Sequence, residues 1–186
     1  MVIREVNKMK IGYGYKLFEM DTMGKLYPLF IGKNKETKIG EWIPAENIPT
    51  KGFAERPGWH CSMDLPDAPW LRGYDGSELG PYKGRNKGWT RVWCLCEYDM
   101  TNDYREEVLS LPGKCMKDKV PENGFYWFKE GSCGTWIITS AIKIVKILTE
   151  EERQKILKEQ GYDEIVAYSK YKVAFEKRKG ILGESA

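Results

Sequence analysis

Hydrophobic and polar positions alternate in short stretches over much of the chain, and glycine and proline separate these stretches. YKLFEM (15–20), the turn DTMG and KLYPLFIG (25–32) predict a β-hairpin. RVWCLCEY (91–98) predicts a further strand because β-branched and aromatic residues dominate it. FYWFKE (125–130) and the long apolar run GTWIITSAIKIVKIL (134–148) predict strands as well. The pattern therefore favours a mostly antiparallel sheet.

Other segments of the chain interrupt this pattern. Pro44, Pro49 and Pro57 predict a long ordered loop with short extended pieces, because proline removes a backbone donor. Residues 71–90 contain repeated glycines and predict an exposed, mobile loop. MTNDYREEVLSL (100–111) predicts a short helix, and GYGYK (12–16) predicts an N-terminal turn rather than a nucleotide loop.

The C-terminal part has helical signals. Thr149 followed by three glutamates forms a capping box, and Gly161 suits the C-terminal cap, so we predict a helix over 150–160. A second helix is expected after Asp163 and up to Gly180. The predicted fold class is α+β. A compact, mostly antiparallel sheet domain that can curve into a barrel spans 1–148, and a helical extension over 149–186 packs on the same domain.

Composition and charge narrow the class of protein. The chain has 30 basic and 27 acidic residues and a formal net charge of +3. This balance disfavours both a strongly basic nucleic-acid coat and an acidic mimic of DNA. Five cysteines without a CxxC pair, and no apolar leader or run of ~20 apolar residues, predict a reduced protein of the cytoplasm with no membrane role.

His60, the single histidine, lies in the proline-rich stretch RPGWHCSMDLPDAPW and is the first candidate for catalysis. In one arrangement, typical of ADP-ribosyltransferases, His60 would hold the ribose of NAD and Tyr98 or Tyr126 would stack on nicotinamide. Glu97 or Glu130 would then polarise the sugar. The alternative is structural: His60 donates to a backbone carbonyl and fixes the loop. The sequence favours a non-enzymatic protein, with this enzyme as the alternative.

The cysteines give weak signals for metal or thiol chemistry. Cys94 and Cys96 share one face of a predicted strand, but they lack the spacing of zinc ribbons. Cys61 is adjacent to His60, yet neighbours on an extended chain point to opposite faces. We therefore expect no metal site and no cofactor, and we interpret these cysteines as small buried residues.

Basic and aromatic residues interleave between residues 70 and 91, a composition that can contact phosphates and stack on bases. A solvated loop whose charges only maintain solubility is an equal alternative. The candidate contact residues are Trp70, Tyr74, Tyr82, Lys83, Arg85, Lys87, Trp89 and Arg91. A second basic surface comprises Lys170, Lys172, Lys177, Arg178 and Lys179.

An ordered set of segments over about residues 15–153 resembles a family of small proteins carried by phages, plasmids and other mobile elements of bacteria. The segments are YKLF, LYPLFIGK, GEWIPAE, PTKGFAERPGWHCS, DAPWL, RVWCLCEY, PENGFYWFK and WIITSAIKIVKIL. Stand-alone members of this size look like anti-defence proteins, including anti-CRISPR inhibitors of type II effector nucleases.

The resemblance implies a non-enzymatic binding protein of the host cell cytoplasm that counters host defence. Its partner would be a CRISPR effector nuclease with its guide RNA, with DNA or RNA as a further contact, and DNA binding or cleavage would be blocked. A nucleic-acid-binding accessory protein is a further alternative beside the enzyme. The oligomeric state stays open.

Overall fold

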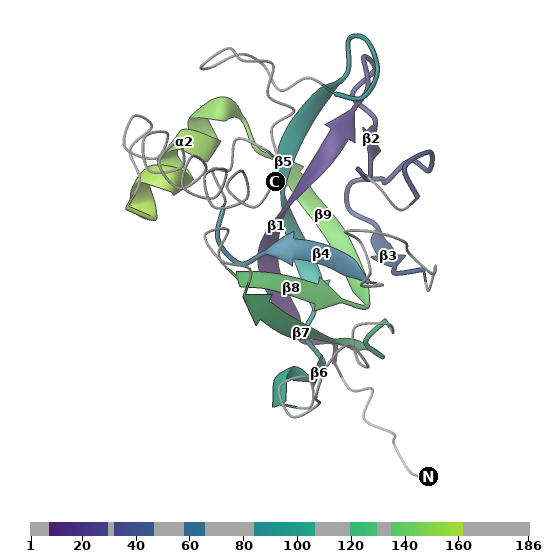
Figure 1. Ribbon diagram of the computed structural model, residues 1–186, viewed down its shortest axis with the longest axis vertical. Helices are drawn as coiled ribbons and strands as arrows, with labels where there is room; N and C mark the ends of the chain where they lie inside the picture. Colours follow the sequence, from purple (N-terminus) through teal and green to yellow (C-terminus); the bar gives the residue numbers. More distant parts are fainter. Residues whose placement is uncertain are drawn as a thin grey trace, which may run out of the picture.

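The computed structural model describes residues 8–29, 32–46, 58–65, 84–106, 120–129 and 135–161, and one sheet connects their strands (Figure 1). The strands are β1 (Ile11–Met20), β2 (Leu26–Tyr27), β3 (Trp42–Pro44), β4 (Trp59–Ser62), β5 (Thr90–Asp99), β6 (Asn102–Asp103), β7 (Gly124–Lys129), β8 (Thr135–Thr139) and β9 (Ala141–Ile147). Their order is β3-β9-β5-β1-β4-β8-β7-β6, and β2 pairs with β1. All pairings are antiparallel except the one between β6 and β7, which confirms a mostly antiparallel sheet with a C-terminal helix.

The predicted hairpin is present, with a longer first strand and a shorter second one than expected. Glu19 pairs with Tyr27 and Met20 pairs with Leu26. Asp21 closes the turn because its Oδ1 accepts the backbone N–H groups of Met23 and Lys25, at 2.9 and 2.8 Å. The hairpin thus follows from local turn chemistry.

The prediction of an N-terminal turn at GYGYK is wrong, because these residues form the first half of β1. All ten residues of β1 pair with β5, from Ile11 opposite Asp99 to Met20 opposite Thr90. A Cβ at Gly12 would lie 2.3 Å from the Tyr98 ring, and one at Gly14 would lie 2.9 Å from the Cys61 sulfur. The two glycines therefore make room for core side chains that cross the strand.

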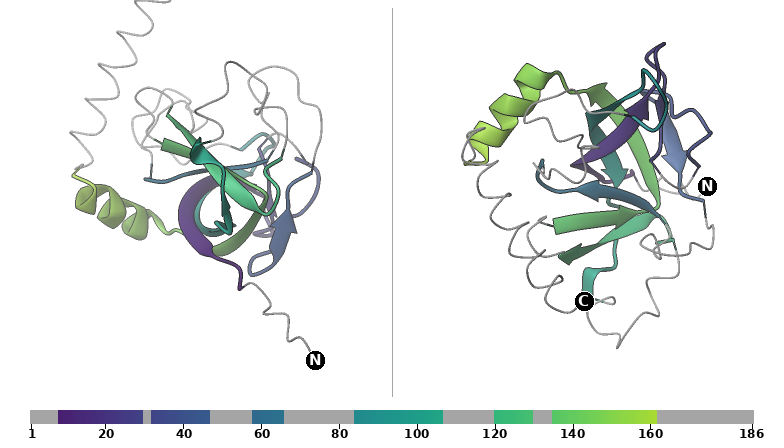
Figure 2. Two further views of the ribbon diagram at one scale, coloured as in Figure 1. Left: turned by 90° about the horizontal axis from the view of Figure 1, so that it is seen from below. Right: turned by 45° about the horizontal axis from the view of Figure 1, so that its top comes forward.

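The long apolar run forms two strands rather than one. It bends at Ser140, so that β8 pairs with β4 and β7 while β9 pairs with β5 and β3. Ser140 donates its N–H to the Gly124 carbonyl at 3.0 Å, and the Thr139 hydroxyl donates to the Asp99 carbonyl at 3.1 Å. Because of this corner, one run of chain pairs with strands in two parts of the sheet. The sheet curves strongly when viewed from below (Figure 2, left).

The helix predicted over 100–111 is wrong at its start. Residues 102–103 form β6, which pairs in parallel with Gly124 and Phe125 of β7. Residues 105–106 are helical, and 107–111 lie outside the described residues. Tertiary pairing with β7 therefore overrides the local helical preference of this segment.

The C-terminal helix α2 (Glu150–Glu159) has the predicted capping box. The Thr149 hydroxyl accepts the N–H of Glu152 at 3.1 Å, and Glu152 accepts the N–H of Thr149 at 2.9 Å. Gly161 has a φ of 91°, a conformation that suits a helix C-terminus. The second predicted helix lies outside the described residues. No helix within the described ranges is long and apolar enough to cross a membrane.

Two hydrophobic clusters lie on opposite faces of the sheet. The inner cluster contains the buried residues Phe18, Leu26, Cys61, Cys94, Cys96, Tyr98, Phe125, Ile137, Ile142 and Ile144. On the outer face, Leu157 of α2 packs in a cluster with Leu17, Trp93, Leu148 and Leu65. Alternation along β1 and β5 supplies both clusters, so the region near α2 is buried on both faces of the sheet.

Candidate partner-binding surface

The structure describes only part of the predicted binding surface. Trp70, Tyr74, Tyr82 and Lys83 lie outside the described residues, as does the second basic surface of Lys170, Lys172, Lys177, Arg178 and Lys179. Arg85, Lys87, Trp89 and Arg91 are described, in a turn and at the start of β5. These four residues and their neighbours make up the described part of the surface.

Two turns meet at one end of the sheet and form, together with Tyr27 next to them, a surface that we call the tip, residues 21–25, 27 and 84–89. In the second turn, Trp89 donates its N–H to the Asn86 carbonyl at 3.0 Å, and Gly84 donates to the Trp89 carbonyl at 2.8 Å. A Cβ at Gly88 would lie 3.1 Å from Thr22, so the two turns are in contact. Met23 is 81% exposed in the first turn, and Lys87 is exposed in the second.

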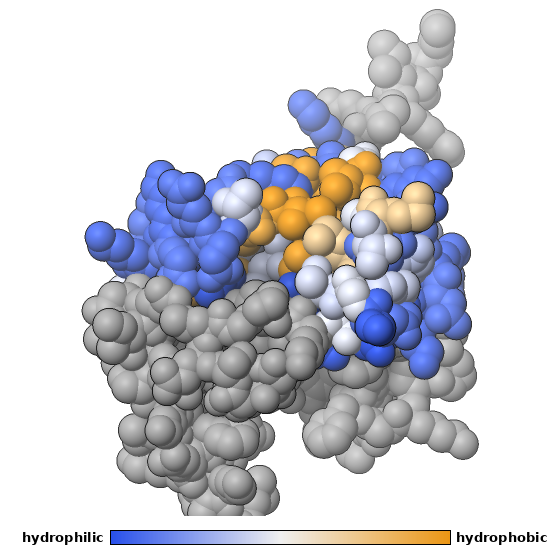
Figure 3. All heavy atoms as spheres, turned by 90° about the horizontal axis from the view of Figure 1, so that it is seen from above, coloured by the Kyte–Doolittle hydropathy of each residue, from blue (hydrophilic) through white to orange (hydrophobic). Residues whose placement is uncertain are grey.

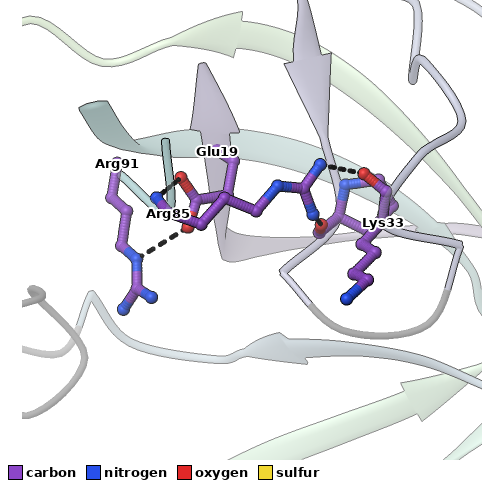
Figure 4. A network of polar contacts seen from close by, with 5 residues as sticks. Glu19, Lys33, Arg85 and Arg91 are labelled. Atoms are coloured by element: carbon purple, nitrogen blue, oxygen red, sulfur yellow. Dashed lines mark hydrogen bonds and ion pairs between the residues drawn. The ribbon is translucent and has the colours of Figure 1, made fainter. Parts of the chain in front are cut away.

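Glu19 attaches the second turn to the sheet (Figure 4). Its side chain is only 1% exposed. It accepts a hydrogen bond from Arg91 Nε at 3.0 Å and one from the backbone N–H of Arg85, also at 3.0 Å. A Cβ at Gly84 would lie 2.5 Å from Glu19 Oε2, so glycine at 84 permits this close approach. Because the β1–β5 register places Glu19 opposite Arg91, the ion pair follows from strand pairing.

The Arg85 side chain joins an aromatic cluster. Its guanidinium carbon lies 5.0 Å from the Trp89 ring centroid and 5.8 Å from that of Tyr27. The two rings stack, with centroids 5.1 Å apart and an interplanar angle of 21°. The guanidinium also donates to the carbonyls of Lys33 and Pro28. Within the loop predicted over 71–90, residues 84–89 therefore form a turn with several internal contacts, Thr90 begins β5, and 71–83 lie outside the described residues.

The tip combines fixed and accessible groups. Arg85, Trp89 and Tyr27 are partly exposed, while Lys87 and Met23 project from the two turns. Sequence reasoning missed Glu19 and Tyr27, although an acidic residue directly after the apolar YKLF was a usable signal. Seen from above, hydrophobic side chains form a band between hydrophilic surfaces (Figure 3). The tip itself offers an apolar side chain from Met23, an aromatic one from Trp89 and cationic ones from Arg85 and Lys87.

The structure describes part of the alternative catalytic set, and it separates His60 from Tyr98. Tyr15 packs against the outer cluster and is opposite Ser62 of β4, so Ser62 and His60, which is two residues before it, face outward. Tyr98, in contrast, belongs to the inner cluster, where its ring centroid lies 5.6 Å from that of Phe125. Tyr126 shares the face of His60, because both pair with Ile138. Glu97 forms an ion pair with Lys143 at 2.7 Å, and Glu130 lies outside the described residues.

The Lys16 side chain lies near the three buried thiols of the inner cluster. Lys16 is opposite Cys94 in the register, donates to the His60 carbonyl at 2.9 Å, and lies 5.5 Å from the Trp59 ring. Burial raises the pKa of Cys61 and Cys94 to about 12, and the pKa of Cys96 lies well above its ordinary value for the same reason. Burial lowers the pKa of Lys16.

These thiols stay protonated at neutral pH, which disfavours their use as nucleophiles. Within the described ranges, no three His, Cys, Asp or Glu side chains are grouped so that they could hold a metal ion. The interpretation of Cys61, Cys94 and Cys96 as buried cysteines is confirmed, since all three are free and buried.

The free energy of unfolding is expected to fall as the pH rises above about 8.5, where thiols of an unfolded chain lose protons. The folded state keeps Cys61 and Cys94 protonated up to about pH 12, so the unfolded state binds fewer protons in this range. The lowered pKa of Lys16 has the opposite effect on the free energy of unfolding below about pH 10.4. Lys16 is a single group, however, whereas three thiols contribute to the decrease.

Urea unfolding over this pH range measures the effect. Cys94→Ala should reduce the slope by about 1 kcal/mol per pH unit. Because the alanine also removes packing contacts, the slope and not the absolute stability is the relevant quantity. An unchanged slope would contradict the assignment of a strongly raised pKa to Cys94.

Comparison with protein-family models, curated proteins and solved structures gave no match to this chain.

Proposed function

We propose that this protein acts by binding and that it inhibits a host defence nuclease, a type II CRISPR effector, in the cytoplasm of the host cell. The supporting observation is the tip, where the Tyr27–Trp89 stack and Arg85 occur on the same pair of turns as the exposed side chains of Met23 and Lys87. The partner class rests on the resemblance of the sequence to mobile-element proteins. The proposed contact is with the effector protein or its nucleic acid.

Physical properties of the tip suit a tight interface. Tryptophan, tyrosine and arginine are enriched among residues that dominate binding energy. Internal hydrogen bonds already fix Arg85, so less conformational entropy is lost when a partner binds. With a net charge of +3 the protein does not resemble DNA, so it would not occupy the positive DNA channel as a mimic. Contact with acidic protein surface, guide RNA or target DNA is the consistent mode.

A cleavage assay tests this function. A type II effector loaded with guide RNA is incubated with its target DNA and increasing amounts of the protein, and inhibition should be complete near equimolar amounts. The double substitution Met23→Ala and Lys87→Ala should weaken inhibition about tenfold or more because it removes exposed contacts without touching Glu19. Lys155→Ala, an exposed change on α2, is the matched control and should have no effect.

The outcomes separate the function classes. If the effector is not inhibited but the protein shifts single-stranded or duplex DNA in a gel with a steep salt dependence, a nucleic-acid-binding accessory protein replaces the proposal. Transfer of label from NAD to lysate proteins that disappears in His60→Ala would establish the enzyme instead. Equal inhibition by the double variant and by Lys155→Ala would show that the tip does not take part in the interface.

A further inference from the structure

The strand β3 lies at one end of the order of described strands, with β9 along one of its edges. Ala45 donates its N–H to the Ser140 carbonyl at 2.7 Å, which continues the β3–β9 ladder. In an antiparallel pair, the backbone groups of successive residues point to alternate edges. The backbone groups of Trp42 and the carbonyl of Pro44 are therefore directed away from β9.

A cavity of about 250 Å³ lies next to β3. Every residue from Glu41 to Glu46 lines it. Since successive side chains of a strand point to opposite faces, a cavity that touches all three residues of β3 lies beside its backbone rather than over one face. The other lining residues are Pro28, Gly32, Lys35, Glu36, Thr37, Lys38, Gly58 and Trp59. The cavity is thus a slot between β3 and the 32–38 segment.

Internal contacts fix the apolar walls of the slot. Trp59 donates its ring N–H to the Ile43 carbonyl at 2.9 Å, and Lys16 Nζ lies 5.5 Å from its ring. Lys143 lies 5.3 Å from the ring of Trp42. Lys35 and Glu46 form an exposed ion pair at 3.1 Å that joins the two walls. The slot therefore exists before any ligand binds.

We propose that the slot binds an extended peptide segment of a partner protein, which adds to β3 as a short strand and inserts a large apolar side chain. Outward backbone groups recognise an extended chain, and the adjacent cavity recognises its side chain. A cavity of about 150 Å³ holds benzene, so this slot accommodates an aromatic ring together with some backbone. Because Pro44 lacks an N–H, the added strand is short. The proposal involves other residues than the tip and stands independently of it.

The backbone amide of Trp42 gives a direct test by hydrogen exchange and NMR. The probe is acetyl-Val-Phe-Val-amide, and the matched probe is acetyl-Val-Ala-Val-amide. Saturation with the phenylalanine probe should slow exchange of the Trp42 amide at least about tenfold, because this amide gains an acceptor. The Ile43 amide, directed towards β9, should not change. The alanine probe should bind at least about tenfold more weakly.

Two results would overturn the proposal. In the first, indole binds in the slot, as seen by NMR shifts at Trp42 and Trp59, while neither peptide changes exchange of the Trp42 amide. The slot would then be a site for small molecules. In the second, the phenylalanine probe does not bind to the protein even at millimolar concentration. A phenylalanine probe with an N-methyl group on each amide retains the side chain and loses the donors, so equal affinity of this probe would also contradict strand addition.

Discussion

Glu19→Ala is expected to lower the free energy of unfolding by about 3 kcal/mol, because removing one partner of a buried ion pair leaves the other uncompensated. Glu19 is 1% exposed and Arg91 is 22% exposed, which places the effect at the lower end of the range for buried pairs. The backbone N–H of Arg85 loses its acceptor as well. Equilibrium unfolding in urea, followed by circular dichroism, measures the change.

Two matched variants separate charge from shape. Glu36→Ala removes an exposed partner of Lys25, at 3.6 Å, and should change stability by less than about 1 kcal/mol. Glu19→Gln keeps an oxygen that can accept from Arg85 and removes the charge, so its effect should lie between the two. If Glu19→Ala and Glu36→Ala had equal effects, Glu19 would not be the anchor of the tip. Glu19→Ala should also weaken partner binding at a temperature where the variant is folded.

Gly12→Ala is expected to destabilise the protein by about 3 kcal/mol, since overpacking a closely packed core forces side chains and backbone to move. The new Cβ would lie 2.3 to 2.6 Å from three atoms of the Tyr98 side chain. Tyr98 is 4% exposed and packs against Phe125, so the ring has little freedom to shift. Thermal and urea unfolding both measure this loss.

The control for this prediction is Gly24→Ala in the hairpin turn. Gly24 has a φ of 82° and nothing within 4 Å of its Cβ position, so only the backbone penalty of about 1 kcal/mol applies. Tyr98→Leu combined with Gly12→Ala should lose less stability than the two single changes added together, because the clash disappears. Additive effects would show that the ring of Tyr98 does not cause the loss.

Local signals accounted for several elements of the fold. Asp21 and Gly24 fixed a turn between alternating stretches, and the capping box at Thr149 fixed the start of α2. Long-range pairing accounted for the errors. GYGYK forms a strand because β5 pairs along its whole length, and 102–103 form a strand because β7 lies alongside.

The candidate surface was predictable only in composition. Basic and aromatic residues at 85–91 were evident, but the sequence showed neither that Arg85 stacks on Trp89 and Tyr27 nor that Arg91 is paired. The contacts of Arg85 and Trp89 with Tyr27, and that of Arg91 with Glu19, join residues more than fifty positions apart in the chain. A pattern read over neighbouring residues carries no information on such pairs.

Alternation and turn residues by themselves determined that this chain forms a mostly antiparallel sheet with a capped C-terminal helix, because these signals act within a few residues. Only the tertiary structure decided that the apolar run bends at Ser140 into two strands, that Glu19 holds the tip, and that a slot runs along β3. The physical reason is that each depends on which strands become neighbours, and the register of those strands is set by burial of the whole sheet.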